Sequence, residues 1–242
     1  MPVLLLLLLS VAVSVGISII VLVVRRSRGH ISPPTPSLDP PASCPLERTC
    51  LFHRPGCWLA IKSRSLRAVQ SALDLHNPKP CSWMRALAGE EKLFIAPPVK
   101  GWVLVMGSGV PDPSDDVDSC FRFMLEVSRK LGQVQLFSYS RVLQHHAWVR
   151  ADHGKVVRAY AWAGRTLWQQ GPRTVAEKDL DLKCFDYTDP AEGVLFECLE
   201  AVSTNVEKVP LLAARWSLDP ARIDERLIEA SPGIAGEPSR RY

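Results

Sequence analysis

Acidic residues are missing from the start of the chain, and the rest of the chain has nearly equal numbers of acidic and basic residues. Residues 1–30 contain no aspartate or glutamate, and the 242 residues together carry 29 lysines and arginines against 25 aspartates and glutamates. Arg25, Arg26 and Arg28 account for most of the formal net charge of +4, which leaves a net charge of +1 for the remainder. A nucleic-acid-binding domain needs a concentrated basic face. The composition therefore argues against nucleic acid as the partner.

The chain also lacks the compact motifs that mark common active sites. G-x-S-x-G and H-E-x-x-H are absent, and no cysteine and histidine stand at a recognisable catalytic spacing. The Gly107-Ser108-Gly109 turn lacks the lysine of a phosphate loop, and the acidic residues around Asp115 and Asp116 would repel a phosphate. Those acids fit the start of a helix better than a cation site. No cofactor is predicted, but catalytic groups can come from distant loops, so an enzyme stays open.

A long uncharged stretch opens the chain. Residues 3–24 form an apolar run of 22 residues, and a membrane span needs about 20. A cleaved signal peptide would instead have a basic start and an apolar core of about 7–15 residues. The sequence therefore predicts an uncleaved, single-pass membrane anchor over residues 1–28. Because the arginines follow the span directly, the positive-inside rule predicts that the following domain is cytoplasmic.

Proline and cysteine mark the connection between the anchor and the domain. Residues 29–49 contain six prolines, which favour extended polyproline II structure and predict a semi-rigid linker. Cys44, Cys50, His53 and Cys57 have ligand types that suit zinc, but their spacing contains no paired C-x2-C. Free thiols are the first interpretation, a disulfide on the oxidising side of the membrane is the second, and zinc is the third. We therefore predict no metal site, with these four residues as its weak candidate.

Apolar runs alternate with helix-start residues through the rest of the chain. The predicted strands before the first hairpin are residues 57–61, 93–96, 102–106 and 133–138. The clearest helix begins after Ser114 or Asp115 and ends at Gly132, and we expect its Phe121 to pack on Trp102 of the preceding strand. Hairpin-linked strands mixed with helices indicate one soluble α+β domain over residues 50–230. It should have a mainly antiparallel sheet with helices on one face, followed by a disordered tail over residues 231–242.

A β-hairpin with one bulky and one small face follows these strands. Residues 152–155 form a turn signal, and side chains on a strand alternate between the two faces of the sheet. Tyr160 and Trp162 therefore share one face, while Ala159 and Ala161 share the other. The small face predicts a helix packed closely across it.

The candidate binding residues lie in and after this hairpin: Tyr160, Trp162, Arg165 and Trp168. An arginine near tryptophan rings can form a cation–π pair or recognise an acidic group. The alternative is that the rings close the sheet as core residues, with the arginine stacked on them.

Two stretches, GWVLVMGSGVPDP and AYAWAGRTLWQQGPRTVAE, resemble an uncharacterised bacterial protein family. The similar region covers residues 100–180. The resemblance implies a shared soluble fold and no known activity, so it supplies no catalytic residues.

Three functions remain open from the sequence. The favoured one is a membrane-anchored, non-enzymatic binding or protein-interaction module, which contacts the membrane through residues 3–24. The alternatives are an enzyme with a site near Tyr160, Arg165 and Trp168, and an immunity- or regulator-like protein that docks a partner on its sheet. A deep pocket with converging polar groups would favour the enzyme, whereas a flat aromatic surface would favour the binding module.

Overall fold

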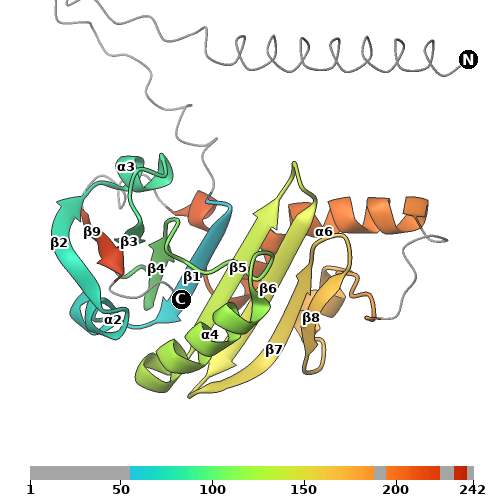
Figure 1. The fold of residues 1–242 in the computed structure, drawn as a ribbon, viewed down its shortest axis with the longest axis horizontal. Coiled ribbons are helices and arrows are strands. Elements are labelled where there is room, and N and C mark those ends of the chain that lie inside the picture. The colour runs from blue at the N-terminus through green and yellow to red at the C-terminus, as the bar shows by residue number, and fades with distance from the viewer. Residues whose placement is uncertain (1–54, 188–194, 224–231, 239–242) are drawn as a thin grey trace, which may run out of the picture. The chain divides into compact units, whose positions relative to one another are not determined.

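The computed structural model describes residues 55–187, 195–223 and 232–238, which build one antiparallel sheet with helices packed on it (Figure 1). The nine strands lie in the order β2-β9-β3-β4-β1-β5-β6-β7-β8. They are β1 (Cys57–Lys62), β2 (Leu75–Cys81), β3 (Leu93–Ile95), β4 (Trp102–Met106), β5 (Val134–Ser140), β6 (His145–Asp152), β7 (Lys155–Trp162), β8 (Thr166–Gln170) and β9 (Gly233–Pro238). The helices are α2 (Leu66–Ala72), α3 (Trp83–Leu87), α4 (Val117–Leu131), α5 (Val175–Asp179) and α6 (Leu195–Trp216), with a 3-10 turn at Pro220–Arg222. The α+β class is confirmed.

Helices cover both faces of the sheet, so the prediction of helices on one face is wrong. Leu59 and Ile61 of β1 pack in one apolar layer with α2 and α4, on what we call the α4 face. Trp58 and Ala60 pack in a second layer with α3 and α6, on the α6 face. All four side chains are buried. Central strands that are apolar at consecutive positions need cover on both sides.

The same two-sided division separates Trp102 from Phe121. Residues 103–106 of β4 are buried, as the apolar run predicted. Trp102 packs in the layer of the α6 face, whereas Phe121 packs in the layer of the α4 face. The expected contact between them is therefore wrong, because the helix after a strand covers only one of that strand's two faces.

The predicted hairpin is confirmed as β6 and β7. Asp152 pairs with Lys155, and the two turn residues His153 and Gly154 both have positive φ, at 45° and 78°. Such a turn matches the twist of the flanking strands. Ala159 and Ala161 are buried in the layer beneath α4, as the small face predicted. The capping residue of α4 is Asp116, one position later than expected, and its carboxylate accepts a 2.9 Å hydrogen bond from the Ser119 amide.

The tail was predicted to be disordered, and this is wrong for residues 233–238. They form β9, which inserts between β2 and β3. Glycine is required there because a Cβ on Gly233 would lie 2.5 Å from the Ile95 carbonyl oxygen, and one on Gly236 would lie 2.5 Å from that of His76. The two glycines allow β9 to fit between its neighbours. Because glycine is uncommon in strands, the same residues argued against a strand in the sequence.

The remaining elements were only partly recognised from the sequence. Asn77-Pro78, a pair that favours a turn or the end of a helix, lies inside the edge strand β2. The helix α6 runs without a break through residues 208–216, although it contains Pro210. Val206, Val209 and Leu212 are fully buried on the sheet, and this packing offsets the helix hydrogen bond that proline removes.

None of the helices in the described residues is long and apolar enough to cross a membrane. The predicted anchor (1–28) and linker (29–49) lie outside the described residues.

Candidate functional site

The four predicted binding residues do not converge on one site. Tyr160 is fully buried and Trp162 half-buried, both in the layer of the α6 face. Trp168 lies opposite Ala161 in the β7–β8 pairing and so shares the α4 face, where its ring meets Phe121 edge-on at 5.8 Å. Arg165 is exposed in the turn between β7 and β8. The pairing register between β7 and β8 places the ring of Trp168 on the opposite face of the sheet from the rings of Tyr160 and Trp162. The sequence does not give this register.

A buried ion pair occupies the position beside Tyr160 on the α6 face. Arg158, 2% exposed, contacts Glu177 of α5, which is fully buried, with Nη2 2.7 Å and Nε 2.8 Å from Oε1. Trp148 of β6 donates its indole N–H to the same oxygen at 2.7 Å. Sequence reasoning missed this pair, although the residues from Thr174 to Glu177 have the pattern of a capping box, and the structure shows that box at the start of α5.

The protein itself satisfies this ion pair. The Arg158 guanidinium also donates to three backbone carbonyl groups of β7, β8 and the turn after β8, and to the Cys184 thiol at 3.2 Å. The second oxygen of Glu177 accepts from the Thr174 amide at 2.7 Å and from its hydroxyl at 2.8 Å. Burial alone would raise the pKa of Glu177, but the hydrogen bonds from Arg158 and Thr174 outweigh it and lower the pKa. Arg158 and Glu177 are both charged, and their hydrogen bonds are made within the protein. The ion pair joins α5 to the sheet.

A neutral histidine extends the same polar layer. Asn205 of α6 bonds both backbone groups of Lys183, so its side-chain amide donates to His146 Nε2 at 3.1 Å. Burial lowers the pKa of His146 to about 3, more than the backbone of Gln144 raises it. Burial also raises the pKa of Tyr160 to about 12, and its hydroxyl accepts from the Phe185 amide at 3.0 Å. Near neutral pH neither group exchanges a proton readily, so they position the chain and do not suit acid–base catalysis.

The four cysteines whose side chains the structure describes are free and poorly suited to nucleophilic chemistry. Burial raises the pKa of Cys57, Cys81 and Cys120, and raises that of Cys184 to about 11, so all four are thiols near neutral pH. Cys57 lies at the start of β1, while the other three members of the weak zinc candidate lie outside the described residues. Among the residues with described positions, no group of three metal-ligating side chains is close enough to hold an ion.

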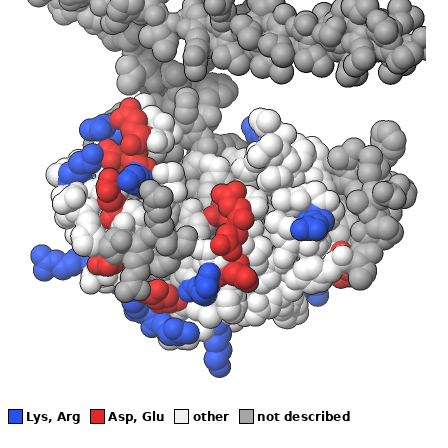
Figure 2. Space-filling model, in the orientation of Figure 1, with Lys and Arg blue, Asp and Glu red and all other residues white. Residues whose placement is uncertain are grey.

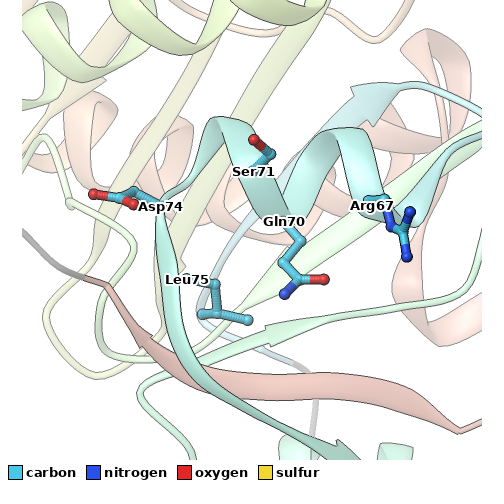
Figure 3. Close-up of a pocket in the computed structure, with 5 residues that line it drawn as sticks. All are labelled: Arg67, Gln70, Ser71, Asp74 and Leu75. Atoms are coloured by element: carbon cyan, nitrogen blue, oxygen red, sulfur yellow. The ribbon is translucent and has the colours of Figure 1, made fainter.

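Two shallow hollows lie near the opposite edge of the sheet from these residues. The first has about 300 Å³ and is lined by Arg67, Gln70 and Ser71 of α2 and by the turn into β2 (Figure 3). The second has about 320 Å³ and lies over β2 and β9, in a region where charged side chains of both signs gather (Figure 2). Its charges pair with one another: Glu91 lies 3.1 Å from both Lys79 and Arg85. Both hollows are open, and the charges around the second one are paired.

Two adjacent apolar side chains are exposed in the turn between β5 and β6, which sequence reasoning missed, and one of them is the most exposed large apolar side chain among the described residues. Val142 is 91% exposed and Leu143 63% exposed. The turn is well ordered by hydrogen bonds, because the Leu143 amide donates to the Ser140 hydroxyl at 3.1 Å and the Gln144 side chain donates to the Arg141 carbonyl at 2.6 Å. Two adjacent aliphatic residues in the centre of a turn, where polar residues are usual, were the available signal.

Comparisons of the chain with family models, with curated proteins and with solved structures give no match.

Proposed function

We propose that the protein is a membrane-anchored, non-enzymatic binding module. Residues 3–24 hold it in the membrane, the proline-rich linker joins them to the α+β domain, and the domain faces the cytoplasm. The support for this topology is the uncharged run of 22 residues followed by three arginines.

One observation carries the preference for binding over catalysis. Arg158 and Glu177 form a buried ion pair surrounded by aromatic side chains, and protein groups occupy the donors and acceptors of that pair. A catalytic cluster needs groups that can reach a substrate and exchange protons with it. This cluster instead fixes the positions of α5, β7 and β8, which suits a stable scaffold that presents its surface to a partner.

The enzyme alternative has less support, because the residues proposed for its site are separated. Tyr160 and Trp168 lie on opposite faces of the sheet, and Arg165 lies in a turn at its end. The residues do not surround a common space where a substrate could contact all three. No observation specifically favours the immunity- or regulator-like alternative.

In-cell photo-crosslinking of the full chain tests the binding module. A photoreactive residue is placed, one position at a time, at exposed apolar sites of the described surface: Met84, Val157, Val175, Tyr187 and Leu211. A binding module should give a discrete protein adduct from one or more positions that share a face. If no position yields an adduct in cells, while the purified chain converts a small molecule, the proposal is wrong and the enzyme alternative takes its place.

Alkaline carbonate extraction tests the anchor separately. The full chain should stay with the membrane fraction, and a variant that lacks residues 1–28 should be released. Release of the full chain would contradict the anchor.

A further inference from the structure

We propose that the end of the sheet that carries Val142 and Leu143 rests on the lipid bilayer. This contact deepens the proposed function and depends on its membrane anchor. The relevant surface consists of the β5–β6 turn (141–144) and the β7–β8 turn (163–165), which we call the turn surface. Its occupant is the interfacial region of a phospholipid bilayer.

The β5–β6 turn has the character of a membrane-inserting loop. Val142 and Leu143 are adjacent, highly exposed aliphatic residues at the apex of a hairpin that projects from the sheet (Figure 1). The hydrogen bonds within the turn fix its shape, so the apolar pair is presented to the outside at little further cost in ordering. Two exposed aliphatic residues do not by themselves mark a contact with another molecule, so their place relative to the entry of the chain into the domain matters.

The chain enters the domain at the same end of the sheet. Cys57 at the start of β1 pairs with Ser138, near the end of β5. The Tyr139 amide donates to the Gly56 carbonyl at 2.7 Å, only three residues before Val142. The segment that leads back to the predicted anchor therefore attaches beside the apolar turn. A tether attached at this point has a shorter reach to the turn surface than to the opposite end of the sheet, which is why we assign the bilayer contact to the turn surface.

The second turn adds side chains that suit a membrane interface. His146 pairs with Trp162 across β6 and β7, which places the β7–β8 turn at this same end. Arg165 is exposed there, and the half-buried Trp162 packs on Phe185 with ring centroids 4.9 Å apart. Tryptophan and arginine are common where protein meets the lipid headgroups, because each combines an apolar body with a polar tip.

The size of the apolar contact favours lipid over a protein partner. A stable protein interface buries more than about 1,000 Å², whereas this turn offers two adjacent aliphatic side chains. Such a contact is weak by itself, but a tether raises the effective concentration of the turn at the membrane surface. Arg141 in the turn is paired with Glu207 of α6 at 2.6 Å, so the contact should not require anionic lipids.

Photo-crosslinking to lipid tests this contact. The full chain is reconstituted in phosphatidylcholine vesicles with a photoreactive residue at position 142 or, as the matched control, at position 153. His153 is 82% exposed in the β6–β7 turn, at the opposite end of the same strand β6. We expect at least fivefold more lipid adducts, detected by mass spectrometry, from position 142, with little change when the salt concentration is raised.

A double variant provides a second measurement. With Val142→Ser and Leu143→Ser, a photoreactive residue at the neighbouring position 144 should yield several-fold fewer lipid adducts than in the parent turn. Equal adducts from positions 142 and 153 would overturn the proposal, and so would adducts at 142 that join two copies of the chain in place of lipid.

Carbonate extraction of the same vesicles separates this inference from the proposed function. A chain that resists extraction but shows no preference for position 142 retains its anchor and loses only the turn contact. A chain that is released overturns both.

Discussion

Individual polar side chains join the region around β7 into one unit. The charges of Arg158 and Glu177 are buried together, and each is satisfied by the other and by backbone groups. Replacing both by apolar residues can be neutral, whereas removing one leaves the other charge buried without compensation. These residues should therefore be sensitive to single substitutions.

Glu177→Gln should destabilise the protein by about 3–5 kcal/mol, because the Arg158 charge stays buried without its partner. The matched control is Asp179→Asn on the same helix, which removes an exposed pair with Arg215 (3.1 Å) and should cost less than about 1 kcal/mol. Urea unfolding of the chain in mild detergent, followed by tryptophan fluorescence, measures both. A similar small loss for the two variants would show that the buried pair does not need its charge.

His146 predicts a specific dependence of stability on pH. Its folded pKa is lowered to about 3, whereas the unfolded pKa is about 6.5. The unfolded chain therefore takes up this proton first as the pH falls. The free energy of unfolding should drop by up to about 1.4 kcal/mol per pH unit between these two values.

The variant His146→Gln should lose this contribution. Measurements between pH 7.5 and pH 5 avoid Glu177, whose lowered pKa places its loss of stability at lower pH. The wild type should lose more stability than the variant across this window. Identical slopes would mean that His146 is accessible to protons in the folded state.

At the scale of elements, the β7–β8 hairpin carries aromatic rings to both faces of the sheet. Trp168 is 6% exposed and packs on Phe121, while Trp162 is half-buried near the turn. The two tryptophans look alike in the sequence, but they should contribute differently to the stability of the fold.

Trp168→Ala should cost about 3–5 kcal/mol, from the lost transfer energy and from the cavity beneath α4. Trp162→Ala should cost clearly less, because its ring is partly in solvent, and Arg165→Ala should change stability little. The urea midpoints of the three variants test this order. A small loss for Trp168→Ala would place that ring on a free surface and revive the predicted aromatic site.

The insertion of β9 depends on glycine. Gly236→Ala would place a Cβ 2.5 Å from the His76 carbonyl oxygen, so β2 and β9 would have to separate. We expect a loss of roughly 2–4 kcal/mol, typical of backbone displacement and overpacking. Gly56→Ala is the control, because its Cβ would meet the Tyr139 carbonyl oxygen at an ordinary 3.4 Å. If thermal unfolding shifts equally for both variants, close approach at β9 does not limit stability.

At the scale of the whole molecule, both edges of the sheet discourage pairing with another chain. The edge strand β2 contains Pro78 and Pro80 and an irregular register after His76. On the edge strand β8, the Tyr187 hydroxyl accepts from the Gln169 amide at 2.7 Å and donates to its carbonyl at 3.3 Å. Blocked edges of this kind leave loops and faces for recognition.

The proposed topology predicts the behaviour of C-terminal fusions. In bacterial cells, alkaline phosphatase fused after Tyr242 should be inactive and a fluorescent protein at the same point should be bright, because the domain faces the cytoplasm. Active phosphatase would reverse the orientation. It would also place Cys44, Cys50 and Cys57 on the oxidising side, where a disulfide becomes the first interpretation.

Local signals in the sequence determined much of the domain by themselves. The apolar runs of β1 and β4, the helix α4 with its terminal glycine, and the β6–β7 turn were predicted and are present. Each depends on residues close together in the chain, so periodicity and turn chemistry were sufficient. The antiparallel α+β class followed from the same signals.

Tertiary structure decided what depends on residues far apart in the chain. The register between β7 and β8 placed Trp168 and Tyr160 on opposite faces and so dispersed the predicted site. Long-range pairing makes the glycine-containing tail a strand, β9. The contact between Glu177 and Arg158 forms only because α5 packs on β7. The side that a ring faces, and the partner that satisfies a buried charge, are set by how distant elements meet, and composition and spacing do not specify this.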